Sequence, residues 1–106
     1  MGITEHKDKS SFDDALKTAG SDLVVVDFFA TWCGPCKRLA PQLEVLAAEK
    51  TTVHFYKVNV DVNELVATKY KIFAMPTIIF IKNGKVVQSV LGADLSKINA
   101  AVTKHM

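Results

Sequence analysis

Residues 24–37 read VVVDFFATWCGPCK, a stretch that combines a strand pattern, a turn and the start of a helix. Its first part belongs to a nearly unbroken apolar run, Leu23 to Ala30, which is typical of a central strand buried on both faces. Its second part turns at the sequence CGPC, residues 33–36, and enters a segment with apolar residues every three or four positions. We therefore expect a buried strand that passes into a long amphipathic helix ending near Lys50, with two cysteines at the junction.

Strand and helix patterns alternate along the rest of the chain. Before the central strand we expect a strand near Ile3 to His6 and a helix that is capped by Ser10 or Ser11 and stopped by Gly20. The long helix should kink at Pro41, and after it we expect a strand over Thr52 to Val60 and a short helix around Asn63 to Tyr70, with Leu65 and Val66 directed inward. The chain should end with two strands, Thr77 to Lys82 and Lys85 to Leu91, joined by a hairpin turn at Asn83-Gly84, and a last helix capped by Asp94 or Ser96. The order β-α-β-α-β-α-β-β-α predicts an α/β fold, with one central mixed sheet of parallel strands plus an antiparallel hairpin and helices on both faces.

The composition excludes several classes of protein. With 106 residues, 49% of them apolar and 23% charged, the chain is expected to form a single domain over residues 1–106. Its net charge is only +2 and is spread along the chain, so we expect no nucleic-acid partner and no membrane surface. Residues 1–12 lack the apolar run of a secretory signal, so export is not expected. We expect a monomer.

The two cysteines, Cys33 and Cys36, predict redox chemistry. They stand where a strand becomes a helix, and the helix N-terminus stabilises an anion such as a thiolate. We expect Cys33 at the exposed start of the helix to be the attacking thiol, and Cys36, on the apolar stripe one turn later, to be shielded and to resolve.

A zinc site is the alternative for this cysteine pair. Tetrahedral zinc needs four ligands, and the sequence offers no second cysteine pair and only His6, His54 and His105. We expect no metal, a surface or half-buried His54 without a chemical role, and solvated His6 and His105 near the chain ends.

Asp27 interrupts the apolar strand and is a second candidate. A buried carboxylate costs several kcal/mol unless it is paired or protonated, so its presence indicates a function or a partner. Lys57, taken alone, is expected to face solvent. Trp32, next to the reactive cysteine, is expected near the surface in a contact role.

The sequence resembles the thioredoxin family over nearly its whole length. The resemblance rests on Trp32-Cys33-Gly34-Pro35-Cys36 together with Asp27, Pro41, Lys57, Met75-Pro76-Thr77, Asn83-Gly84 and Gly92-Ala93. It implies the thioredoxin fold and a protein disulfide reductase, in which Cys33 attacks a client disulfide and Cys36 displaces the reduced client. It also implies that Asp27 accepts the proton of Cys36 and that Lys57 pairs with Asp27.

The resemblance further implies a client-docking surface around the cysteines. This surface comprises Trp32, Met75, Pro76, Gly92 and Ala93, with Gly34 and Pro35 in the active-site loop and the Met75–Pro76 bond cis. No bound cofactor is implied, since electrons come from NADPH through a thioredoxin reductase. Implied clients include peroxiredoxins and the reductases of ribonucleotides or methionine sulfoxide.

Two positions distinguish branches of the family. Phe29 stands where the bacterial branch commonly has a second Trp, and Met75 where it often has Ile. Both are similar to the eukaryotic cytosolic branch, which predicts a cytoplasmic protein.

Two alternative functions stay open at this point. Gly34-Pro35 between the cysteines disfavours an oxidase or isomerase, because those members commonly carry His beside the second cysteine. A binding module that uses Trp32, Met75 and Ala93 without redox turnover is the alternative from another class.

Overall fold

The alternation of strands and helices is confirmed by the computed structural model, which describes residues 2–106. The elements are β1 (Ile3–Glu5), α1 (Lys9–Ala19), β2 (Val24–Phe29), α2 (Gly34–Glu49), β3 (His54–Asn59), α3 (Glu64–Lys69), β4 (Thr77–Lys82), β5 (Lys85–Leu91) and α4 (Leu95–His105). Their order is the expected one. The bounds expected for the hairpin strands β4 and β5 are reproduced without change.

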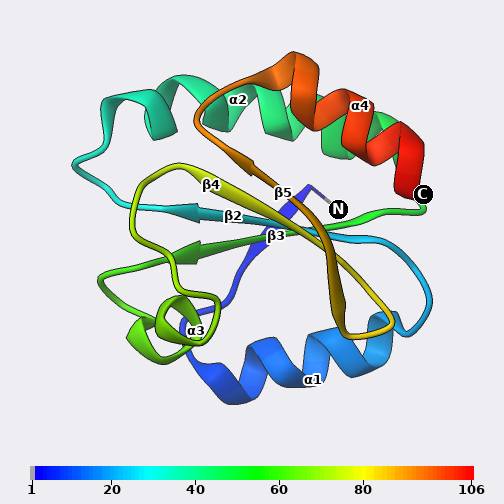
Figure 1. The fold of residues 1–106 in the computed structure, drawn as a ribbon, viewed down its shortest axis with the longest axis horizontal. Coiled ribbons are helices and arrows are strands. Elements are labelled where there is room, and N and C mark those ends of the chain that lie inside the picture. The colour runs from blue at the N-terminus through cyan, green and yellow to red at the C-terminus, as the bar shows by residue number, and fades with distance from the viewer. Residues whose placement is uncertain (1) are drawn as a thin grey trace.

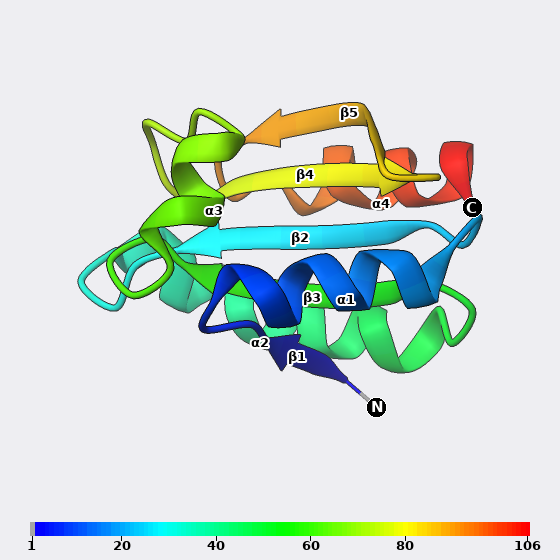
Figure 2. The same cartoon turned by 90° about the horizontal axis from the view of Figure 1, so that it is seen from below.

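All five strands form one mixed sheet in the order β1-β3-β2-β4-β5. The strands β1, β3 and β2 run parallel, whereas β4 is antiparallel to β2 and β5 is antiparallel to β4. Helices α2 and α4 cover one face of the sheet, and α1 and α3 cover the other (Figures 1 and 2). The strand β2 therefore lies at the centre of the sheet, which explains why its sequence is apolar on both faces.

Each face of the sheet has its own apolar core. On the side of α2 and α4 the buried side chains include Val25, Leu39, Leu43, Phe55, Phe80 and Ile98. On the side of α1 and α3 they include Phe12, Val26, Phe28, Val58 and Val66. The alternation of Val25 and Val26 between the two cores is the period of two that a strand imposes.

The helix ends follow local hydrogen bonding, with one difference from the sequence prediction. The N-cap of α1 is Asp8, whose side chain accepts from the backbone N–H of Ser11, so the expectation of Ser10 or Ser11 is wrong. Gly20 ends α1 at a positive φ of 56°, a conformation that glycine adopts without strain. At α4 the expected cap Asp94 is confirmed, since it accepts from the N–H of Lys97.

The short helix α3 buries only one of its two expected apolar residues. Val66 is fully buried, whereas Leu65 is 69% exposed, so the inward prediction is wrong for Leu65. Adjacent residues on a helix point about 100° apart, and a helix of six residues cannot turn both toward the sheet.

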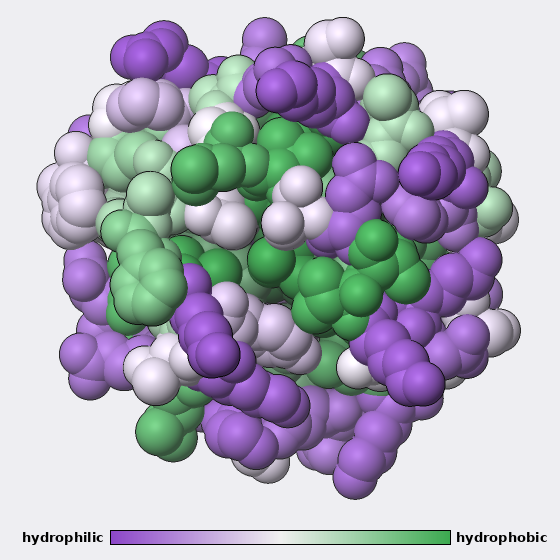
Figure 3. Space-filling view, viewed as in Figure 1, coloured by the Kyte–Doolittle hydropathy of each residue, from purple (hydrophilic) through white to green (hydrophobic). Residues whose placement is uncertain are grey.

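The strand β5 forms an open edge of the sheet. Figure 3 views the molecule from the side of this edge, where apolar patches lie among polar side chains. Val86, Val87 and Leu91 of β5 are exposed there. The register between β4 and β5 shifts at Phe80/Ile81, and such an irregularity limits pairing of the edge with another chain.

Candidate active site

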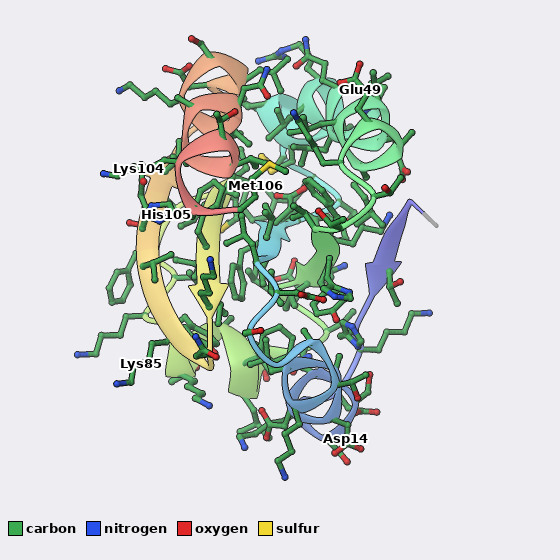
Figure 4. All side chains as sticks on the ribbon, turned by 90° about the vertical axis from the view of Figure 1, so that its right-hand side faces the viewer. Asp14, Glu49, Lys85, Lys104, His105 and Met106 are labelled. Atoms are coloured by element: carbon green, nitrogen blue, oxygen red, sulfur yellow. A yellow bond between two sulfur atoms is a disulfide. The ribbon has the colours of Figure 1, made fainter. Side chains whose placement is uncertain are left out.

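Cys33 and Cys36 lie at the N-terminus of α2, just after the chain leaves the sheet at the end of β2. They are joined by a disulfide, drawn in yellow in Figure 4, and their Cα atoms are 5.3 Å apart. Cys33 is the N-cap of α2, and its sulfur accepts a hydrogen bond of 3.2 Å from the backbone N–H of Cys36. The free amides and the dipole of this helix end stabilise negative charge on the Cys33 sulfur when the disulfide opens.

The burial of Cys33 differs from the sequence prediction. Its side chain is 5% exposed, and that of Cys36 is 3% exposed, so both are buried in the disulfide form. The reason is that the Cys33 sulfur is bonded to Cys36 and lies against Met75, whose carbonyl oxygen is 3.7 Å away. Shielding of Cys36 is confirmed, whereas exposure of Cys33 in this form is wrong.

Trp32 lies beside the disulfide with its side chain 67% exposed, as its expected contact role requires. Its indole N–H donates a hydrogen bond of 3.0 Å to a carboxylate oxygen of Asp61. Asp61 follows the end of β3, the strand next to β2, so the topology brings it to the same end of the sheet. Sequence reasoning missed Asp61, because an exposed indole N–H can bond water and does not by itself indicate a protein acceptor.

The loop before β4 closes the other side of the disulfide. The Met75–Pro76 peptide bond is cis, as the resemblance implies, and the Pro76 carbonyl accepts a hydrogen bond of 2.8 Å from the N–H of Gly92. This bond ties the segment that carries Met75 to the end of β5. Around the cysteines, Pro35 and Ala93 are exposed, Met75 and Gly92 are half-buried, and Pro76, which was expected on the docking surface, is buried. The residues expected to dock a client thus lie on three loops at one end of the sheet.

Asp27 lies under the disulfide on the α2 side of β2. It is 5% exposed and shares a cavity of about 250 Å³ with Cys36. Its oxygen Oδ1 is buried and has no hydrogen-bond partner among residues 2–106. Burial raises the pKa of the Asp27 carboxyl to about 7, and the charge of Lys57 acts in the opposite direction. A carboxyl group with a pKa near neutrality can both take up and release a proton under ordinary conditions.

Lys57 is the register partner of Asp27 on the neighbouring strand β3. Its side chain lines the same cavity and is half-buried rather than directed to solvent. No ion pair of 4.0 Å or less joins Lys57 to Asp27 in the described part of the chain. The ammonium group instead lies over the ring of Phe29, 5.6 Å from its centroid.

The three histidines stand apart from the disulfide. His54 is half-buried, as expected, and bonds the carboxylate of Asp22 at 3.0 Å. His105, labelled in Figure 4, is half-buried and lies 2.8 Å from a side-chain oxygen of Gln88.

His6 is buried, at 7% exposure, so its expected solvation is wrong. The cause is its position after the edge strand β1, where its backbone N–H donates to the carbonyl of Lys57 and its ring packs on Tyr56.

Within residues 2–106 no group of three or more His, Cys, Asp or Glu side chains is arranged to hold a metal ion. None of the helices there is sufficiently long and apolar to span a bilayer.

Comparison with known proteins places these features in a family. The sequence profile of the family described as Thioredoxin matches residues 3–104. Thioredoxin-2 of Saccharomyces cerevisiae is 46% identical over 104 residues, which cover 98% of this chain and 99% of the yeast protein.

Solved structures agree in fold. The thioredoxin of Fasciola hepatica superposes with a TM-score of 0.94 at 42% identity and covers 100% of both chains. That of Schistosoma mansoni gives 0.93 at 46% identity, covering 99% of this chain and 96% of the other. A structure concerned with thiol resolution in yeast mitochondrial 1-Cys peroxiredoxin by the glutathione and thioredoxin systems gives 0.89 at 31% identity, covering 96% and 94%.

Proposed function

This chain belongs to the thioredoxin family and has its fold, and on that premise we propose that Cys33 is the attacking thiol and Cys36 the resolving thiol of a protein disulfide reductase. Thiol–disulfide exchange through the Cys33–Cys36 pair is the chemistry of this family, and it proceeds without a bound cofactor. The observation that carries the assignment of roles is the position of Cys33 as the N-cap of α2, because the helix end favours the thiolate there.

The reaction begins with the reduced dithiol. The Cys33 thiolate attacks one sulfur of a client disulfide, forms a mixed disulfide and releases the other client sulfur as a thiolate, which takes up a proton. Cys36 then loses its proton and attacks the Cys33 sulfur, which releases the second client thiol and leaves the Cys33–Cys36 disulfide. Two electrons pass to the client, and a thioredoxin reductase restores the dithiol.

Asp27 is the proposed acceptor of the proton that Cys36 loses. The carboxyl group and Cys36 line one partly open cavity, which brings the proton donor and its acceptor into the same space. A pKa of about 7 lets Asp27 accept a proton in one half-reaction and return it in the other.

Clients dock, in this proposal, on Trp32, Met75, Pro76, Gly92 and Ala93. These residues surround the disulfide on three loops, and an extended client segment can pair with the backbone beside Cys33. A peroxiredoxin is one proposed client, supported by the 31%-identical neighbour whose structure concerns peroxiredoxin resolution. The similarity to Saccharomyces thioredoxins supports the proposed site of action in the cytoplasm.

Reduction of insulin disulfides by dithiothreitol tests the assigned roles. We expect the wild-type chain to accelerate it, and both Cys33→Ser and Cys36→Ser to abolish the acceleration. With a stoichiometric client, only Cys36→Ser should accumulate a mixed disulfide at Cys33. Accumulation on Cys33→Ser instead would reverse the roles. A double Cys→Ser variant that retains the biological role of the chain would favour the binding module.

A further inference from the structure

Phe29 occupies a distinctive place beside the proton acceptor proposed above. It follows Asp27 by two residues on β2, so both side chains lie on the face of the sheet that α2 covers. Both line the 250 Å³ cavity together with Cys36 and Lys57. Its half-buried ring also packs against the cluster formed by Ala30 and the two cysteines.

The ammonium group of Lys57 has two possible partners within reach. Adjacent strands lie about 4.8 Å apart, and Lys57 is the direct register partner of Asp27, so its side chain starts beside the carboxyl group. Its Nζ nevertheless lies over the Phe29 ring at 5.6 Å and forms no ion pair with Asp27, whose Oδ1 has no partner within residues 2–106. An aromatic face attracts an ammonium group through its quadrupole, so the Phe29 ring stabilises the Lys57 ammonium group in this position.

The distance between the Lys57 ammonium group and Asp27 affects the pKa of the Asp27 carboxyl group. The other titratable or charged side chains at the cavity are Cys36 and Lys37 of α2, whereas the register partner of Asp27 on β4 is the apolar Ile78. A direct ion pair with Lys57 would hold Asp27 as a carboxylate too weakly basic to take the proton of Cys36 at neutral pH. Complete removal of the positive charge would favour the protonated carboxyl group instead.

We infer that Phe29 is a positioning residue for proton transfer: its ring holds the Lys57 ammonium group away from Asp27 and so keeps that carboxyl group able to accept and return the proton of Cys36. The inference rests on the proposed role of Asp27. It gives a specific task to a side chain that the resemblance to the family marks only as a difference between branches.

Titration of the Asp27 carboxyl group tests the inference directly. ¹³C NMR of the oxidised protein follows this group without coupling to the thiols, because the disulfide-bonded cysteines do not titrate. The wild-type midpoint is expected near 7. In Phe29→Leu the released ammonium group should approach Asp27 and lower the midpoint by about one unit, the lower limit for an opposite charge within 4–6 Å. Phe29→Tyr and Phe29→Trp keep a ring and should retain the wild-type midpoint.

Two further variants separate positioning from a loss of packing. Phe73→Leu makes the same chemical change at an exposed loop position and should leave the midpoint unchanged. In a Lys57→Met background there is no ammonium group to release, so Phe29→Leu should no longer lower the midpoint.

An unchanged midpoint in Phe29→Leu, or an equal shift with and without Lys57, would overturn the inference. Failure of the underlying function has a different signature. If Asp27→Asn keeps the wild-type rate and pH profile of disulfide reduction, Asp27 is not the proton acceptor, whatever the titration of Phe29→Leu shows.

Discussion

Asp27 and His6 are both buried and ionisable, and they lie in the cores on opposite faces of the sheet. Burial acts on both by disfavouring the charged form, so it raises the pKa of Asp27 and lowers the pKa of His6, the latter opposed in part by the charge of Asp8. The physical cause is the same on the two faces. The consequences differ because the neighbours differ.

The surroundings of His6 hold it in place. Its Nδ1 lies 2.6 Å from the Ser11 hydroxyl, and its ring meets the rings of Phe12 and Tyr56 edge to face. Its carbonyl accepts from the Asn63 side chain, which ties the end of β1 to the start of α3. Each residue has one buried atom without a hydrogen-bond partner within residues 2–106, Nε2 of His6 and Oδ1 of Asp27. The difference is that Asp27 lines a cavity together with Cys36. Burial becomes useful for catalysis where the buried group shares space with the reacting atoms.

The largest effect expected from this contrast is a change in the free energy of unfolding of Asp27→Asn. The folded state raises the carboxyl pKa from 3.8 to about 7, so native Asp27 binds a proton more tightly than unfolded Asp27. Stability is therefore lost as pH rises from about 4 to 7, and the loss above pH 7 is on the order of 4 kcal/mol. Urea unfolding of the oxidised proteins should show Asp27→Asn to be more stable by this order at pH 8, and nearly equal to wild type at pH 4. Equal stability at pH 8 would contradict the burial cost.

A smaller effect of opposite sign is expected from His6. Its folded pKa lies below 6.5, so the unfolded chain binds the proton more tightly and stability is lost as pH falls below about 6.5. Because Asp27 titrates in an overlapping range with the reverse slope, the effect is best measured in the Asp27→Asn background. Unfolding there should become easier between pH 6.5 and 5, and adding His6→Gln should remove that slope. A slope that survives the substitution would assign it to another group.

The smallest effect concerns the hydrogen bond that holds the His6 ring. Ser11→Ala removes the hydroxyl partner of Nδ1 and should lower the free energy of unfolding by about 1 kcal/mol at neutral pH. Ser10→Ala is the matched control, since Ser10 is the exposed neighbour in the same helix turn. Ser→Ala raises the helix propensity at both positions, so the Ser10→Ala value from urea unfolding is subtracted from that of Ser11→Ala. Equal changes in the two variants would mean that the bond to His6 contributes nothing.

The sequence predicted the elements that depend on local pattern. The apolar run of β2, the hairpin around Asn83-Gly84 and the cysteines at the start of α2 were all located correctly, because period, turn chemistry and helix capping are properties of neighbouring residues. The cap of α1 was wrong by two or three positions, because Asp8, Ser10 and Ser11 all favour such a site and only the observed bond selects Asp8.

What the sequence could not supply was contact between distant residues. Burial of His6 depends on Tyr56, and the orientation of Trp32 depends on Asp61, 29 positions away. The position of Lys57 over Phe29 is of the same kind, since strand register pairs Lys57 with Asp27 and does not predict the contact with Phe29. The candidate site was thus predicted as a set of residues, whereas its internal contacts required the fold.

If burial serves proton transfer at Asp27 and only structure at His6, the two residues should differ in their effect on the pH profile of insulin reduction between pH 6 and 9. Wild type, Asp27→Asn and His6→Gln are compared at saturating dithiothreitol. We expect Asp27→Asn to slow reduction most near neutral pH and to lose the inflection near 7, whereas His6→Gln should follow the wild-type profile. An unchanged profile in Asp27→Asn, or an equal loss in His6→Gln, would show that the two buried groups do not differ in this way.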